Sequence, residues 1–113
     1  MNEQENKISL ADYFKSANTD QSQFNYIDDE KKTPSLKEAQ DFVGGYVECI
    51  TFPNGDVLIV NEEGKLRGLP LNPEATTLWR STFTKDKYSF GYDDFVVGPA
   101  ILIKANALKR WAA

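Results

Sequence analysis

Two glycine-bearing turns divide residues 46–69 into three short runs, and this division limits the possible folds more than any other feature. The first turn, PNG, contains a proline that cannot donate a strand hydrogen bond, so a three-residue loop with Gly55 in the left-handed conformation is favoured over a two-residue turn. The second turn, EEG, repeats the pattern with Gly64. The sequence therefore predicts a three-stranded antiparallel meander over roughly residues 46–52, 56–61 and 65–69.

The predicted register determines which side chains share a face of the sheet, because side chains alternate along a strand. It pairs Thr51 with Val57 and Val47 with Asn61 across the first turn. One face, the expected main core, carries Ile50, Phe52, Leu58, Val60 and Leu66. The other face carries Val47, Cys49, Val57, Ile59 and Leu69, followed by the polar residues Asn61, Lys65 and Arg67.

Further elements flank the meander. Ser35 and Glu38 fit a capping box for a helix over residues 35–43, which the following glycines end. Asn72 predicts the start of a second helix, and Asn106 that of a short C-terminal one. An edge strand over residues 23–27 and a buried strand within 95–104, kinked at Gly98-Pro99, complete the elements.

The predicted fold class is α+β, with the antiparallel meander, additional strands, and two or three short helices packed on one face of the sheet. Residues 1–20 are polar and are expected to form a flexible N-terminal arm. Residues 21–113 are expected to form a single domain.

Composition excludes several classes of function. Histidine is absent and Cys49 is the only cysteine, so an intramolecular disulfide and a structural zinc site are excluded. The commonest general base and metal ligand is also missing. We therefore predict a protein that is not an enzyme, with no catalytic residues, metal site or cofactor.

Charge and hydropathy bear on partners and location. The net charge of −4 argues against general binding of nucleic acid, which depends on lysine and arginine neutralising phosphates. No apolar run approaches the roughly 18 residues of a membrane span. The N-terminus has neither the basic start nor the apolar core of a secretory signal, and with its lone cysteine the chain is expected in the cytoplasm.

Several short motifs occur in a fixed order: VGGYVE (43–48), NEEGKL (61–66), LPLN (69–72) and VVG (96–98). In these motifs, over about residues 35–104, the chain resembles a small phage and mobile-element family known only as a domain of unknown function. Pro73-Glu74 stands where that family usually has an arginine, and the arm of residues 1–20 is not typical of it. The resemblance implies a phage-encoded accessory protein that works in the cytoplasm of a bacterial host, and it implies no activity.

Two groups of residues are candidate binding sites. The first group, Asn61, Lys65 and Arg67, forms the polar end of the second face of the predicted sheet. These side chains suit an anionic group or an acidic partner. The turn itself, NEEGK, is interpreted as a solvated turn rather than a metal or phosphate loop. The loop of residues 82–94 contains more aromatic residues than a simple solvent-exposed linker would. We expect it either to fold back on the sheet or to form a contact surface. Its candidate residues are Phe83, Tyr88, Phe90 and Tyr92.

Three other residues have structural interpretations. Cys49 is expected to be a small buried residue, because nothing nearby in the sequence activates its thiol. Trp79 is expected in the core. Glu48 faces the main core, opposite Val60, and is expected to bond loop N–H groups, with a functional acid as the alternative.

Two hypotheses about function follow. The first is a non-enzymatic protein-binding or host-modulating module whose partner is a host or phage protein. The alternative is a small-molecule or nucleotide-phosphate binding protein that uses the polar end of the sheet. Lys65 and Arg67 are expected to contribute to partner binding rather than to stability.

Overall fold

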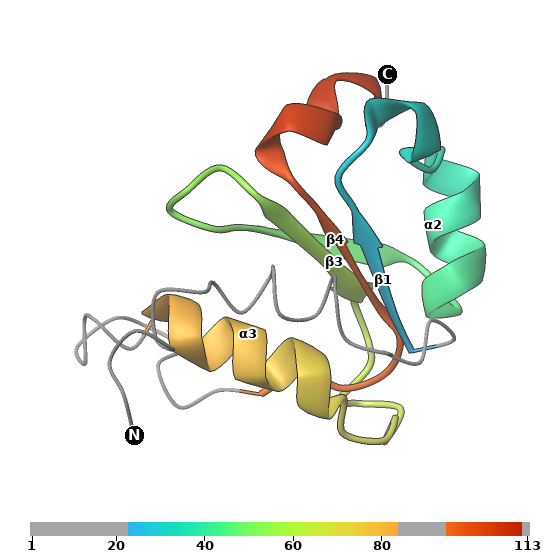
Figure 1. Cartoon of the computed structure of the whole chain (residues 1–113). Coiled ribbons are helices and arrows are strands. Elements are labelled where there is room, and N and C mark those ends of the chain that lie inside the picture. Colours follow the sequence, from blue (N-terminus) through green and yellow to red (C-terminus); the bar gives the residue numbers. More distant parts are fainter. Residues whose placement is uncertain (1–22, 84–94, 112–113) are drawn as a thin grey trace.

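A computed structural model describes residues 23–83 and 95–111. Four strands and two α-helices with two 3₁₀-helices make up this part of the chain (Figure 1). The elements, in order, are β1 (Phe24–Ile27), η2 (Glu30–Lys32), α2 (Leu36–Val43), β2 (Val47–Thr51), β3 (Val57–Asn61), α3 (Pro73–Phe83), β4 (Ala100–Ile103) and η3 (Ala105–Arg110). The predicted α+β class is confirmed.

The four strands form one mixed sheet in the order β1-β4-β3-β2. β2 and β3 pair antiparallel in the predicted register, with Thr51 opposite Val57 and Val47 opposite Asn61. Gly55 has a φ of 94°, and Phe52 N donates to Asp56 O at 2.8 Å, so the three-residue loop is confirmed. β4 pairs antiparallel with β3 and parallel with β1, which is an edge strand as expected.

The predicted third strand of the meander, over residues 65–69, is wrong. Residues 62–68 form consecutive turns, and β4 takes the place beside β3. Leu69 N donates to Gly64 O and Gly68 N donates to Lys65 O, the paired bonds of a Schellman motif. Gly68, not Gly64, has the positive φ, at 66°. The segment therefore makes one helix-like turn closed by Gly68.

Helices cover both faces of the sheet rather than one. α3 packs on the face that carries Leu58, Val60 and Leu102, whereas α2 and η3 pack on the opposite face. Figure 1 shows α2 and α3 on different sides of the strands. All residues of β3 and β4 are buried, and all but Asn61 are apolar, which is typical of a sheet covered on both faces.

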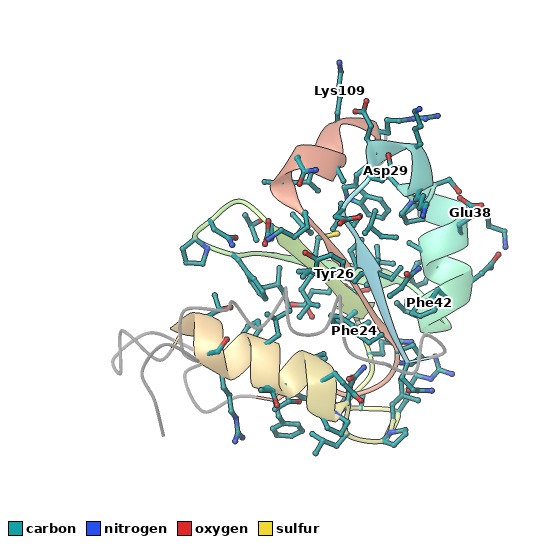
Figure 2. All side chains as sticks on the ribbon, viewed as in Figure 1. Phe24, Tyr26, Asp29, Glu38, Phe42 and Lys109 are labelled. Atoms are coloured by element: carbon teal, nitrogen blue, oxygen red, sulfur yellow. The ribbon has the colours of Figure 1, made fainter. Side chains whose placement is uncertain are left out.

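The two helices begin where their capping residues predict. Ser35 Oγ accepts from Glu38 N at 3.1 Å and Glu38 returns the bond to Ser35 N, so the capping box is present. Gly44, with a φ of 83°, ends α2. Phe42 packs against the sheet from α2, and Glu38 lies on the outer face of the helix (Figure 2). Asn72 Oδ1 accepts from Ala75 N at 3.0 Å and caps α3.

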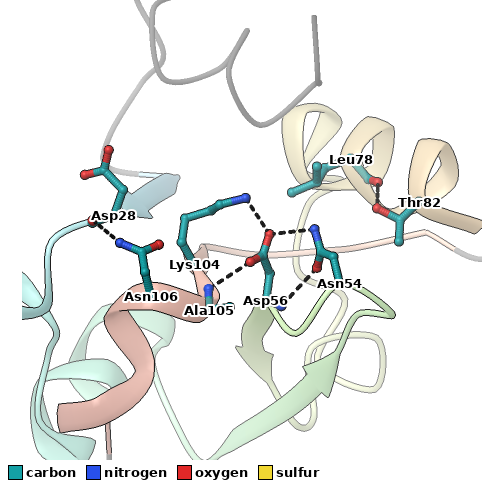
Figure 3. A network of polar contacts seen from close by, with 8 residues as sticks. All are labelled: Asp28, Asn54, Asp56, Leu78, Thr82, Lys104, Ala105 and Asn106. Carbon is teal, nitrogen blue, oxygen red and sulfur yellow. Dashed lines mark hydrogen bonds and ion pairs between the residues drawn. The ribbon is translucent and has the colours of Figure 1, made fainter. Parts of the chain in front are cut away.

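A buried carboxylate ties the β2–β3 loop to the end of β4 (Figure 3). Asp56 is 3% exposed, and its Oδ1 accepts from Ala105 N at 2.8 Å. Its Oδ2 accepts from Lys104 Nζ at 2.7 Å and from Asn54 Nδ2 at 3.0 Å. The same residue thus holds the hairpin turn and the start of η3 together.

The predicted division into an arm over residues 1–20 and a domain over residues 21–113 stays a prediction, because the arm lies outside the described residues. Within the described ranges, no helix is long and apolar enough to cross a membrane.

Candidate functional site

A pocket of about 560 Å³ opens on the α3 side of the sheet, beside the edge strand β2. Its walls come from β2, β3, α3, the 62–66 turn and the segment that precedes β4. The side chains that define it are Glu48, Ile50, Val60, Lys65, Leu66, Trp79, Phe95 and Val96. With Glu62 also in its wall, the pocket is an apolar hollow with two acids and one base at its margin.

The floor of the pocket is part of the main core. Val60 and Trp79 are buried, and the Trp79 ring meets the Phe52 ring edge-on, with centroids 6.3 Å apart. Trp79 is thus a core residue, as expected. Because the floor is fixed by core packing, the hollow belongs to the rigid part of the described fold.

Two large apolar side chains stand exposed at the rim. Leu66 is 88% exposed and Phe95 is 42% exposed. The prediction that Leu66 lies on the core face is wrong, because the turn closed by Gly68 directs it outward. Lys65 Nζ lies 4.5 Å from the centroid of the Phe95 ring, a cation–π distance.

The structure separates the three polar candidate residues. Asn61 is buried; its Nδ2 donates to Val43 O at 3.0 Å, and its Oδ1 accepts from Glu63 N at 2.8 Å. Arg67 Nη1 donates to Gly44 O at 2.9 Å. Asn61 and Arg67 therefore meet at the C-terminal end of α2, where they bind its last carbonyl groups. Lys65 instead lies at the pocket rim.

The aromatic candidate side chains fall outside the described part of the structure. Phe83 is the last residue of α3, and its side chain lies outside what the structure describes. Tyr88, Phe90 and Tyr92 also lie outside the described residues. Their proposed contact role stays a prediction.

The expectation that Cys49 is buried is wrong, because β2 is an edge strand and leaves the residue exposed. Partial burial nevertheless raises the pKa of the Cys49 thiol above its usual value, and the charge of Glu48 raises it further. A hydrogen bond with the Trp111 side chain acts in the opposite direction. The thiol is therefore poorly activated, as the sequence predicted.

Glu48 lies on the predicted face, opposite Val60, but it is exposed at the margin of the pocket. No hydrogen bond of its side chain is seen among the described residues. The expected bonds to loop N–H groups are therefore not formed within this part of the structure.

The pocket itself was not predicted, although some of its residues carried a signal. Ile50 and Val60 were assigned to one face, and Trp79 to the core. What was missing was the proximity of residues 95–97 to the 62–66 turn. That proximity follows from the pairing of β4 with β3 and from the isolated bridge between Leu71 and Val97.

In the described ranges, no three Asp, Glu or Cys side chains gather closely enough to hold a metal ion.

No curated protein and no solved structure matches the chain significantly. One protein family does match, over residues 17–110, which is most of the chain. The chain therefore belongs to the family described as a domain of unknown function, DUF3846.

Proposed function

We propose that this protein is a non-enzymatic protein-binding module, encoded by a phage or mobile element, that modulates a host protein in the bacterial cytoplasm. The observation that carries the proposal is the pocket beside β2 together with its exposed apolar rim. An apolar hollow with exposed large side chains beside it is typical of a contact site for another protein.

Charge distribution around the pocket supports a protein rather than an anionic small molecule. Glu48 and Glu62 both line the hollow, and Lys65 is the only base among its described residues. Lys65 already contacts the Phe95 ring. Acids at the mouth of a site disfavour phosphate groups by like-charge repulsion.

The alternative, a nucleotide-phosphate site at the polar end of the sheet, has less support. Asn61 uses both ends of its amide to bind the protein's own main chain. Arg67 donates to the end of α2. Both side chains are therefore engaged in holding the end of α2 and the following turn, and Lys65 contacts the Phe95 ring instead.

The proposal is tested by capture of host proteins on the immobilised chain, comparing Leu66→Asp with Leu71→Asp. Both leucines are exposed, at 88% and 56%, but only Leu66 lines the pocket. We expect a host protein that binds the wild-type chain and Leu71→Asp and is lost from Leu66→Asp. The affinity of the purified host protein for the wild-type chain and for both leucine variants is then measured.

A thermal-shift panel of nucleotides and phosphates tests the alternative. A ligand present at 100 times its Kd would raise the free energy of unfolding by about 2.7 kcal/mol. Such a shift, abolished by Arg67→Ala and accompanied by no host protein that distinguishes the two leucine variants, would contradict the protein-binding proposal.

A further inference from the structure

We infer that the partner binds as an extended segment, added antiparallel to the outer edge of β2, with an apolar side chain in the pocket and a basic side chain against Glu48. This inference rests on the proposed protein-binding function and specifies the chemistry of the partner. It uses two independent features, the main chain of β2 and the side chains of its pocket-facing side.

The first feature is an unpaired row of main-chain groups. Glu62 N donates to Tyr46 O, and Phe52 N donates to Asp56 O, so the even-numbered residues of β2 direct their N–H and C=O groups to β3. Val47, Cys49 and Thr51 therefore direct theirs outward. β2 is the last strand of the sheet, and no described residue bonds this outer edge. Such an edge is a template for one more strand.

The second feature is the pattern of side chains along the same strand. Glu48 and Ile50 both point to the pocket, and both line it. An antiparallel segment that bonds to Val47, Cys49 and Thr51 would place one residue directly opposite Ile50 and, two positions later, one opposite Glu48. The first would reach the hollow between Ile50 and the exposed Leu66. The second would meet a carboxylate, which favours arginine or lysine.

The occupant is therefore a segment with an apolar residue followed, two positions on, by a base. A second copy of this chain does not fit. If two β2 edges paired about Glu48, Cys49 or Ile50, Glu48 would lie opposite another Glu48, an Ile50 or a Phe52. None of these registers offers the carboxylate a cation, and each chain carries a net charge of −4. In the antiparallel orientation the two side chains of the segment lie directly opposite Ile50 and Glu48, which brings the base against the carboxylate.

The main-chain part is tested with synthetic nonapeptides of alternating threonine and valine that carry a central phenylalanine and an arginine two positions later. N-methylation of the residue between them removes the amide that bonds to Cys49. N-methylation of the phenylalanine modifies an amide that points away from β2, and is the matched control. We expect the first change to weaken binding to the full chain at least tenfold, measured by fluorescence anisotropy, and the second to leave binding nearly unchanged.

The side-chain part is tested by charge exchange. Glu48→Lys is expected to lower the affinity for the arginine peptide about tenfold. It is expected to raise the affinity for a peptide with glutamate in place of arginine. Glu63→Lys makes the same charge change at an exposed acid that does not line this pocket, and is expected to affect neither peptide. A peptide with phenylalanine and arginine exchanged is expected to bind at least tenfold more weakly.

Thr51→Pro removes an outward N–H and is expected to abolish peptide binding, with Thr51→Val as the control and far-UV circular dichroism to verify folding. The inference is overturned if neither N-methylation matters, if the exchanged peptide binds equally, or if ultracentrifugation finds a dimer that Thr51→Pro dissociates. A host protein that distinguishes Leu66→Asp from Leu71→Asp, yet binds Thr51→Pro normally, would retain the proposed function and overturn only the added strand.

Discussion

Two glycines, four residues apart, are required for different physical reasons. Gly68 has a φ of 66° and no atom within 4 Å of the position a Cβ would take, so its requirement is conformational. Gly64 does not have a positive φ, but a Cβ there would lie 2.9 Å from Val97 Cγ2. Its requirement is space. Sequence alone does not distinguish the two requirements, because each is met by a glycine.

A double-mutant cycle distinguishes the two requirements. Gly64→Ala and Gly68→Ala are each expected to lower the free energy of unfolding by about 1–2 kcal/mol, the first through overpacking and the second through left-handed strain. Val97→Ala opens the space beside Gly64 only. It should therefore offset part of the loss in Gly64→Ala and add independently to Gly68→Ala, as measured by urea denaturation. Additive losses in both pairs would contradict the steric role of Gly64.

At the scale of single elements, the sequence predicts those defined by local signals. The capping box of α2, the Asn72 cap of α3 and the loop ending at Gly55 all depend on groups within a few residues of one another. Local hydrogen bonds and backbone preferences are written in short sequence patterns, so these elements were predictable.

Residues 62–69 illustrate what local reasoning could not determine. The EEG turn followed by apolar and basic residues fits a hairpin, but it also fits a helical turn ended by Gly68. The choice depends on β4, which arrives from about 40 residues later and takes the edge of β3. The pocket depends on the same long-range pairing. It was therefore not predicted, for the same reason that the third strand was predicted wrongly.

Asp56 joins the β2–β3 loop to the start of η3, so its replacement should destabilise both. Asp56→Ala removes the acceptor of three hydrogen bonds and leaves Lys104 without this ion pair, so we expect a loss of about 2–4 kcal/mol in the free energy of unfolding. Lys104→Met is the matched control; its side chain is 24% exposed, so a loss of about 1 kcal/mol is expected. Equal losses in chemical denaturation would mean that the ion pair, not the bond to Ala105 N, provides the stability.

At the scale of the whole molecule, the described cores are built from residues between Phe24 and Trp111. Among the described residues, one core lies on each side of the sheet. The sequence predicted the class and the two side-chain sets of the β2–β3 hairpin. It did not predict that both sets would be covered, because each helix stripe is compatible with either face.

Deletion of residues 1–20 is therefore expected to leave the melting temperature nearly unchanged. The arm carries few apolar residues, and ordering its backbone would cost roughly 1–2 kcal/mol per residue. Differential scanning calorimetry of the full and shortened chains measures the difference. A drop of more than a few degrees would mean that the arm docks on the domain, and Phe14→Ser in the full chain would then reproduce the drop.

The position of β4 has a consequence for biosynthesis. Of the four described strands, β4 is the last to leave the ribosome, yet it lies in the interior of the sheet, between β1 and β3. Until it emerges, β1 lacks its neighbour among the described strands, and the β2–β3 hairpin lacks the strand that pairs with β3. The described sheet of a nascent chain therefore cannot close until β4 has been synthesised, and over that interval its apolar strands are exposed to aggregation.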